Sequence, residues 1–114
     1  MVNAFGDVLD PKTGLLLAGT RDAKEGKKLI DTRQLMREGA ARNKRFVENT
    51  TLAIAITNAK LRREELKRIA QIGHNAFARC ITPAHTTYDG DVVFALSAGE
   101  MEADLNSVAI LVEE

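Results

Sequence analysis

A run of eight apolar or β-branched residues in the middle of the chain constrains the fold more than any other segment. The run is Thr50-Thr51-Leu52-Ala53-Ile54-Ala55-Ile56-Thr57. Because a strand covered on both faces is apolar throughout, this pattern predicts a buried central strand. A second apolar run over 92–96 predicts another buried strand. We therefore expect a core built around these two strands.

The segment between the two runs has helical periodicity. Asn58 to Lys60 turn the chain, and 61–81 predicts a helix of about five turns. Its apolar residues fall on one stripe: Leu66, Ile69, Ala70, Gly73, Phe77 and Cys80. Pro83 is expected to end the helix, and Cys80 is expected in the core.

The flanking segments predict further strands and helices. Residues 2–19 predict a hairpin, since Asp10-Pro11-Lys12-Thr13-Gly14 is a turn pattern between two apolar runs. Asp31 is a candidate N-cap for a short helix through residue 38, and 102–114 predicts a final helix. The order β-β-α-β-α-β-α gives an α+β, layered α/β fold over 1–114, as a single domain or a domain fragment.

Composition excludes several classes of protein. The chain has 114 residues with 16 basic and 16 acidic side chains, so no net field draws it to nucleic acid or to a membrane. The single cysteine cannot form an internal disulfide. Together with two histidines it is too few ligands for a structural zinc site. No apolar run reaches the ~20 residues that span a bilayer. We therefore expect a cytoplasmic globular protein.

The charges are segregated along the sequence. Residues 21–49 carry nine basic and five acidic side chains, 50–81 carry six and two, and 82–114 carry seven acids and no base. Faces of opposite charge that attract one another within the fold explain this segregation, and a basic face toward a polyanion is the alternative. Residues 40–49 show no hydrophobic period and are expected to form an exposed linker.

The first candidate for chemistry is the junction Asn49-Thr50-Thr51, where the expected linker meets the expected strand. Cleavage of the Asn49–Thr50 bond would give Thr50 a free α-amine with a pKa of about 8, which could accept the proton of the hydroxyl. Thr50 would then be a nucleophile. The alternative is structural, because threonine is common where a strand begins.

The second candidate is the segment His85-Thr86-Thr87-Tyr88-Asp89-Gly90-Asp91. Its two carboxylates, Asp89 and Asp91, lie on a glycine turn directly before a core strand, where ligand-facing loops often lie. They could hold an ammonium group, relay protons or bind a hard cation, although the spacing does not match a calcium loop. The alternative is an Asx turn that starts the strand. His85 could be a general base or a hydrogen-bonded loop residue.

Asn3 is the third candidate. A polar amide within an apolar strand needs hydrogen-bond partners. An NH2 group aimed at a cleft would be an oxyanion donor. The position of Asn3 alone leaves both interpretations open.

Several segments, taken in order, resemble one family of enzymes. They are Val2-Asn3-Ala4-Phe5-Gly6-Asp7-Val8, Asp10-Pro11 with Gly14, Glu48-Asn49-Thr50-Thr51-Leu52-Ala53, Ile81-Thr82-Pro83-Ala84-His85-Thr86 and Asp89-Gly90-Asp91-Val92-Val93-Phe94-Ala95. The chain resembles the C-terminal part of the DmpA-type L-aminopeptidase/D-esterase family, which also contains the nylon-oligomer hydrolase. The resemblance covers essentially the whole chain and is weakest over 20–47.

The resemblance implies an αββα sandwich of the N-terminal-nucleophile type and a precursor that cleaves itself. It implies cleavage of the Asn49–Thr50 bond, with Thr50 as the nucleophile that forms an acyl-enzyme. Asn3 matches a residue that stabilises the oxyanion. Asp89 and Asp91 match paired acids that orient the amine and support proton transfer, whereas His85 matches a histidine without an assigned role. Neither a metal nor a cofactor is implied.

The relatives are longer, so the resemblance also implies that 1–49 is the end of a large chain and 50–114 a small chain after cleavage. The expected partners are a small peptide, amide or ester substrate, a missing N-terminal portion of the enzyme, and further copies in a homo-oligomer. One alternative is a truncated, catalytically silent fragment that acts as an oligomerising or binding module. Another is acyl transfer to an amine instead of water.

Overall fold

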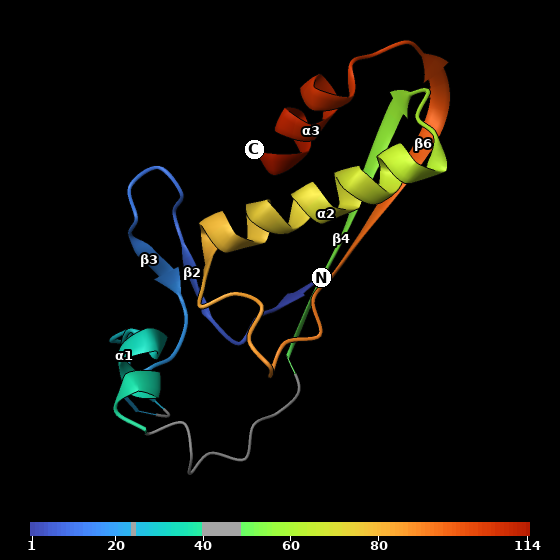
Figure 1. The fold of residues 1–114 in the computed structure, drawn as a ribbon. Coiled ribbons are helices and arrows are strands. Elements are labelled where there is room, and N and C mark those ends of the chain that lie inside the picture. Colours follow the sequence, from blue (N-terminus) through green and yellow to red (C-terminus); the bar gives the residue numbers. More distant parts are fainter. Residues whose placement is uncertain (24, 40–48) are drawn as a thin grey trace. The chain divides into compact units, whose positions relative to one another are not determined.

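The structure is a computed structural model that describes residues 1–23, 25–39 and 49–114. The described residues form an α+β fold, as expected (Figure 1). Its elements are β1 (Val2–Asn3), β2 (Asp7–Leu9), β3 (Leu16–Ala18), α1 (Thr32–Arg37), β4 (Thr50–Ala59), α2 (Arg63–Cys80), β5 (Ile81–Thr82), β6 (Val92–Met101) and α3 (Leu105–Glu113). They fall into two compact units. The two-helix unit comprises Met1, Leu52–Phe77 and Val92–Glu114, and the short-strand unit comprises Val2–Thr51 and Ala78–Asp91.

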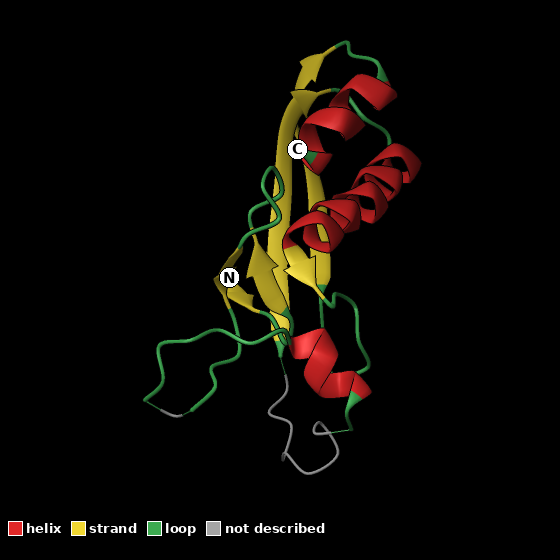
Figure 2. Ribbon diagram, turned by 90° about the vertical axis from the view of Figure 1, so that its left-hand side faces the viewer, coloured by secondary structure: helices red, strands yellow, loops and turns green. Residues whose placement is uncertain are grey.

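The two-helix unit is built on the pairing of β4 with β6. These strands run parallel, with Leu52 beside Val92 and Thr57 beside Ser97. Parallel neighbours need a crossover connection, and α2 belongs to that connection. Helices α2 and α3 both lie on one face of the strand pair (Figure 2). The core on that face is formed by Ala59, Ile69, Val108 and Ala109.

Small residues let α2 approach the strands closely. Gly73 of α2 packs against β6, where a Cβ at this position would lie 2.8 Å from Val93 Cγ1. Ala55 of β4 and Ala95 of β6 are small residues that pack against the same core. The expected apolar stripe of α2 is confirmed at its centre, because Ile69 and Gly73 are buried.

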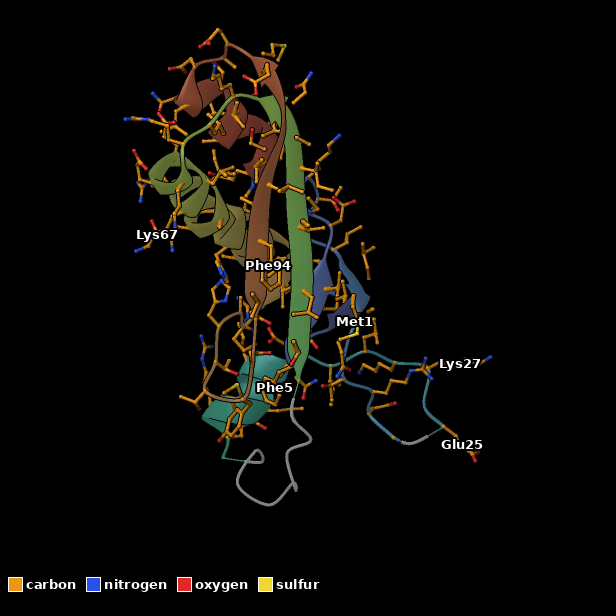
Figure 3. All side chains as sticks on the ribbon, turned by 90° about the vertical axis from the view of Figure 1, so that its right-hand side faces the viewer. Met1, Phe5, Glu25, Lys27, Lys67 and Phe94 are labelled. Atoms are coloured by element: carbon orange, nitrogen blue, oxygen red, sulfur yellow. The ribbon has the colours of Figure 1, made fainter. Side chains whose placement is uncertain are left out.

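The opposite face of the β4–β6 pair is apolar and exposed among the described residues. Ile54 and Phe94 are 59% and 58% exposed (Phe94 is labelled in Figure 3). The same face carries Leu52, Ile56, Val92 and Leu96. The sequence predicts strands covered on both faces, and within the described residues that expectation is wrong. Because both runs are apolar at successive positions, their pattern cannot reveal that one face lies open.

In the short-strand unit, β2 is the centre of a small sheet. It pairs antiparallel with β3 and with β5, so the expected hairpin is confirmed for β2 and β3. The expected strand over 2–9 is interrupted, because Val2–Asn3 pair instead with Thr50–Thr51 at the start of β4. The interruption includes Gly6, where a Cβ would meet the backbone around Pro83.

Asp7 of β2 joins several segments of the short-strand unit. Only 1% of the residue is exposed. Its carboxylate accepts hydrogen bonds from Thr20 N at 3.1 Å, Thr32 N at 2.7 Å and Thr32 Oγ1 at 2.6 Å. Thr32 begins α1, whose N-cap is Asp31, as expected. The chain turns after this helix at Gly39, whose φ of +73° favours glycine.

Some boundaries differ from the expected ones. The long helix ends at Cys80, and Ile81–Thr82 form β5 because they pair with β2. The strand expected over 92–96 extends to Met101, so that α3 begins only at Leu105. The linker expected over 40–49 lies outside the described residues except for Asn49.

No helix among the residues that the structure describes is long and apolar enough to cross a membrane.

Candidate active site

The expected site residues all lie in the short-strand unit, on three of its segments. Asn3 is in β1, Thr50 begins β4, and Asp89 and Asp91 lie in the loop that precedes β6. Asn3 and Thr50 are partners in the antiparallel register of β1 and β4. Residues directly opposite one another in such a pair project to the same side of the sheet, so the Asn3 and Thr50 side chains share a face.

Asn49, which precedes the bond that is expected to be cleaved, forms hydrogen bonds with two segments. Asn49 N donates to Tyr88 O at 3.2 Å, and Gly90 N donates to Asn49 O at 2.8 Å. Asn49 Nδ2 donates to Asn3 O at 3.1 Å. The Thr50 hydroxyl donates to the Asn49 carbonyl oxygen at 2.7 Å. The bond that is expected to be cleaved is therefore fixed, with the Thr50 hydroxyl beside its carbonyl group.

Asp89 holds the loop against the segment between β1 and β2. Its Oδ1 accepts from Phe5 N at 3.1 Å, and its Oδ2 accepts from Thr86 N at 3.0 Å and Thr86 Oγ1 at 2.6 Å. The rings of Phe5 and Tyr88, with centroids 5.2 Å apart, join the same two segments. Hydrogen bonds to a carboxylate are stronger than those between neutral groups, so Asp89 fixes the path of the loop.

Asp91 contacts the residue that follows Thr50. Its Oδ1 accepts from Thr51 N at 2.9 Å, and its Oδ2 faces His85 Nδ1 at 3.1 Å. The Asp91 side chain is 5% exposed and that of His85 38% exposed. The contact is an ion pair only when His85 is protonated. His85 has a φ of +54°, a conformation that is uncommon for a residue with a Cβ, so the loop holds its backbone in a strained form beside Asp91.

The loop also brings Gly90 against Thr50. A Cβ at residue 90 would lie 3.2 Å from Thr50 Oγ1. The Thr50 hydroxyl donates to Asn49 O and not to either carboxylate. Asn3 contributes its backbone carbonyl to the hydrogen bonds described above. The sequence predicts Gly90 only as a turn residue. The one sequence feature that places it near the expected site residues is its position between Asp89 and Asp91.

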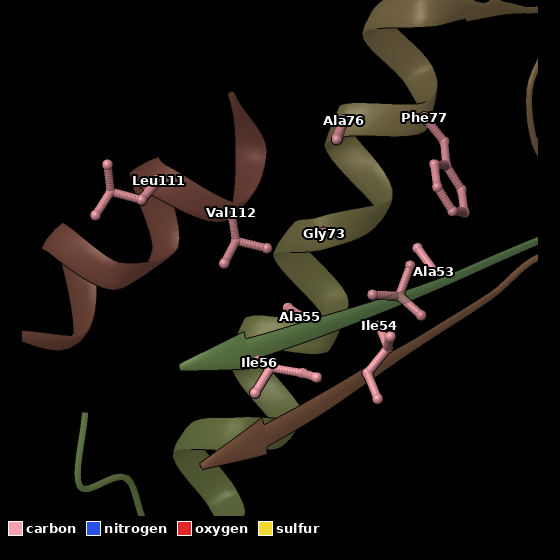
Figure 4. A pocket seen from close by; sticks show the side chains of 10 residues that line it. Ala53, Ile54, Ala55, Ile56, Gly73, Ala76, Phe77, Leu111 and Val112 are labelled. Carbon is pink, nitrogen blue, oxygen red and sulfur yellow. The ribbon is translucent and has the colours of Figure 1, made fainter. Parts of the chain in front are cut away.

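Other parts of the described structure group fewer side chains that could take part in catalysis or bind a metal. In the two-helix unit, an apolar pocket of about 270 Å³ lies between β4, α2 and α3 (Figure 4). Its lining has no titratable side chain and includes Ala53, Ala55, Gly73, Ala76, Phe77 and Val112. In the described ranges, no three His, Cys, Asp or Glu side chains are grouped so that they could hold a metal ion.

Two acids near the starts of helices have lowered pKa values. A hydrogen bond from the Arg33 side chain lowers the pKa of Asp31, with smaller contributions from backbone N–H groups. A hydrogen bond from the Arg62 side chain likewise lowers the pKa of Glu65. Both acids lie at helix starts, so these shifts concern the stability of helices.

Residues 12–114 match the model of one protein family, described as peptidase family S58. The chain belongs to peptidase family S58. Thr50, Asp89 and Asp91 lie within the matched range, and Asn3 precedes it. The resemblance to the DmpA-type enzymes is thereby confirmed.

Three proteins to which this chain is similar are much longer than the chain itself. An uncharacterized aminopeptidase of Mycobacterium tuberculosis is 40% identical over 105 residues, which cover 87% of this chain and 30% of the relative. One from Mycobacterium leprae is 34% identical over 103 residues, 90% of this chain and 28% of the relative. A 6-aminohexanoate-oligomer endohydrolase of Agromyces sp. is 29% identical over 102 residues, 88% of this chain and 28% of the relative. The chain thus spans less than a third of the length of these relatives.

Proposed function

We propose that this chain carries the self-cleaving, nucleophilic part of an amide hydrolase, in which Thr50 becomes the N-terminal nucleophile. One observation carries the proposal: the Thr50 hydroxyl lies 2.7 Å from the carbonyl oxygen of Asn49. A hydrogen bond from Gly90 N to the Asn49 carbonyl oxygen and one from Asn49 N to Tyr88 O hold Asn49 in place. Membership of a peptidase family supports cleavage chemistry of this kind.

Self-cleavage begins with attack of Thr50 Oγ1 on the carbonyl carbon of Asn49. The hydroxyl proton passes to the Thr50 nitrogen, the C–N bond breaks, and an ester joins the Asn49 carbonyl to the threonine oxygen. Water then hydrolyses the ester. The products are a carboxyl group on Asn49 and a free α-amine on Thr50.

In the cleaved protein, the Thr50 amine serves as the base for its own hydroxyl, since its pKa of about 8 suits proton transfer near neutral pH. Asp91, which binds the next backbone N–H at Thr51, orients the amine, and Asp89 holds the loop that carries Asp91. Asn3, the partner of Thr50 in β1, donates to the oxyanion. The hydroxyl attacks the substrate carbonyl, and water releases the acyl group.

The proposed substrates are small peptides, amides or esters. Relatives named as an aminopeptidase and as an oligomer endohydrolase support hydrolysis of an amide bond. Since the chain spans 30% of the length of the aminopeptidase, we propose that the remainder of a longer enzyme supplies further pocket residues. A homo-oligomer and a cytoplasmic location stay predictions from the sequence.

A catalytically silent oligomerising or binding module is the second candidate. The exposed apolar face of β4 and β6 favours it, because such a face suits an interaction surface. The two candidate functions predict a different fate for one peptide bond. The hydrolase cuts Asn49–Thr50 by itself, and the silent module keeps this bond intact.

Mass spectrometry of the purified chain distinguishes the two. We expect the wild-type chain to separate into residues 1–49 and 50–114 on incubation, and Thr50→Ala to stay whole. Thr51→Val is the matched control, since it removes the neighbouring hydroxyl and keeps Thr50, and it should be cut like the wild type. A wild-type chain that stays uncut and forms a stable assembly would favour the silent module. Cleavage of Thr50→Ala would exclude Thr50 as the nucleophile.

A further inference from the structure

The carbonyl oxygen of Asn49 accepts two hydrogen bonds, and one of its donors has no part in the mechanism given above. Gly90 N donates to it at 2.8 Å. The Thr50 hydroxyl donates to the same oxygen at 2.7 Å. All three residues belong to the short-strand unit.

The bond from Gly90 is part of a parallel β-bridge between Asn49 and Asp89. In most sheets such a bond only joins strands. Here its acceptor is the carbonyl group that the Thr50 hydroxyl attacks during self-cleavage. When the carbonyl carbon becomes tetrahedral, its oxygen takes up negative charge, and an N–H that is already in place stabilises this charge without rearrangement.

Other contacts of Asn49 keep the carbonyl group aimed at Gly90. The Asn49 N–H donates to Tyr88 O at 3.2 Å, and the Asn49 side chain donates to Asn3 O at 3.1 Å. These bonds restrain the residue from both its backbone and its side chain. The Asn49 carbonyl oxygen is thereby kept close to the N–H group of Gly90, which the loop holds in place.

We propose that the Gly90 N–H is the oxyanion donor of self-cleavage, which makes Gly90 a catalytic residue for scission of the Asn49–Thr50 bond. The assignment rests on the proposed function. The bond from Thr50 Oγ1 to the Asn49 carbon forms, the peptide C–N bond breaks, and the hydroxyl proton goes to the Thr50 nitrogen. Gly90 holds the charge on the Asn49 oxygen until the carbonyl group re-forms as the ester.

The same contacts explain why residue 90 is a glycine. A Cβ there would lie 3.2 Å from Thr50 Oγ1 and 3.7 Å from Asn49 O. Because packed atoms resist closer approach, a side chain at this position would push the nucleophile away from the carbonyl group. Glycine lets the N–H and the hydroxyl reach one oxygen together.

Replacing the Asp89–Gly90 amide by an ester removes this N–H and keeps every side chain. The sequence has one cysteine, Cys80, so synthetic residues 80–114 can be ligated to a thioester of residues 1–79 to give the full chain. The control is the same replacement at Val108, whose N–H donates to Asp104 O at 3.2 Å in α3. The all-amide chain assembled in the same way is the reference.

We expect the Gly90 ester to slow cleavage of the Asn49–Thr50 bond about a hundredfold, the usual cost of one lost oxyanion donor. The Val108 ester should be cut at the rate of the all-amide chain. A Gly90 ester cut at that rate would overturn the assignment of Gly90 and leave Thr50 as nucleophile. An all-amide chain that stays uncut would contradict the proposed function, and the assignment would fall with it.

If the Gly90 ester does not fold, a second measurement tests the assignment of Gly90 as the donor to the Asn49 oxygen. In isotope-labelled Thr50→Ala, which lacks the nucleophile, NMR can detect the coupling across the hydrogen bond from Gly90 nitrogen to the Asn49 carbonyl carbon. We expect this coupling to be present in the folded chain. Its absence would overturn the assignment independently of any cleavage.

Discussion

Thr50 and Thr51 are adjacent residues with the same side chain, but their hydroxyl groups differ in hydrogen bonding. The Thr50 hydroxyl donates to the Asn49 carbonyl oxygen. Thr51 is 2% exposed, and its hydroxyl oxygen has no hydrogen-bond partner among the described residues. The Thr51 backbone N–H is bound by Asp91. The two adjacent threonines therefore differ, because Thr50 donates its hydroxyl to the preceding carbonyl group and, in the described part of the chain, Thr51 forms a hydrogen bond only through its backbone.

Thr51→Val is expected to raise the free energy of unfolding by about 1 kcal/mol. Valine has the same shape and removes a buried hydroxyl whose hydrogen bond is unmade. Urea unfolding measures the change. Thr57→Val is the matched control in the same strand, since Thr57 Oγ1 accepts from Ala59 N at 3.1 Å, and it should lower the stability. A loss of stability in both variants would contradict the burial described for Thr51.

At the scale of elements, α1 depends on its N-cap. The Asp31 side chain accepts from the backbone N–H groups of Arg33 and Gln34, and the Arg33 side chain binds the same carboxylate at 3.0 Å. The hydrogen bond from the Arg33 side chain is the main reason that the pKa of Asp31 lies below its usual range. Because the folded pKa is the lower one, the carboxylate stabilises α1 when it is ionised.

The helix content of α1 should therefore depend on pH with a definite sign. The contribution of Asp31 is fully present above the unfolded pKa of about 3.9 and is lost as the pH falls through the lower folded pKa. Carbon chemical shifts of residues 32–37, followed from pH 7 to pH 2, should show helix loss only below about pH 4. In Asp31→Asn this step should disappear, since asparagine caps equally well and does not titrate. An unchanged step in that variant would assign the effect to another acid.

Gly73 is where α2 meets β6, and its replacement should be destabilising. Glycine to alanine within a helix usually stabilises by about 1 kcal/mol. Here the new Cβ would lie 2.8 Å from Val93 Cγ1, and overpacking should instead lower the free energy of unfolding by about 1 to 2 kcal/mol. Urea unfolding of Gly73→Ala tests this. Val93→Ala in the same chain makes room and should restore part of the loss, whereas a stabilised single variant would show that the contact is absent.

For the whole chain, periodicity and turn chemistry predict α1, α2, the β2–β3 hairpin and the strands β4 and β6. They do not predict β5, because Ile81 has the apolar character of the preceding helix and becomes a strand only through pairing with β2. Thr50, Asp89 and Asp91 are predicted as site residues by resemblance. Gly90 is not predicted as a site residue, because its proposed contribution is a backbone N–H group, which every residue except proline has.

The exposed apolar face of β4 and β6 should determine how the chain associates. We expect the wild-type chain to form an assembly in sedimentation velocity experiments, since a face with six exposed large apolar side chains is seldom left open. Phe94→Lys places a charge on the face and should shift the chain toward the monomer. Lys67→Ala, at an exposed position of α2 (Figure 3), should leave the assembly unchanged. A monomeric wild-type chain would contradict the prediction.

The most direct measurement of the central claim is capture of the ester between Asn49 and Thr50 with hydroxylamine. If the Thr50 hydroxyl attacks the preceding carbonyl group, hydroxylamine will cleave the ester and leave a hydroxamate on Asn49. We predict that mass spectrometry of the treated wild-type chain finds residues 1–49 as this hydroxamate, and finds Thr50→Ala uncut. A treated wild-type chain that stays whole, or that is cut at another bond, would contradict the account.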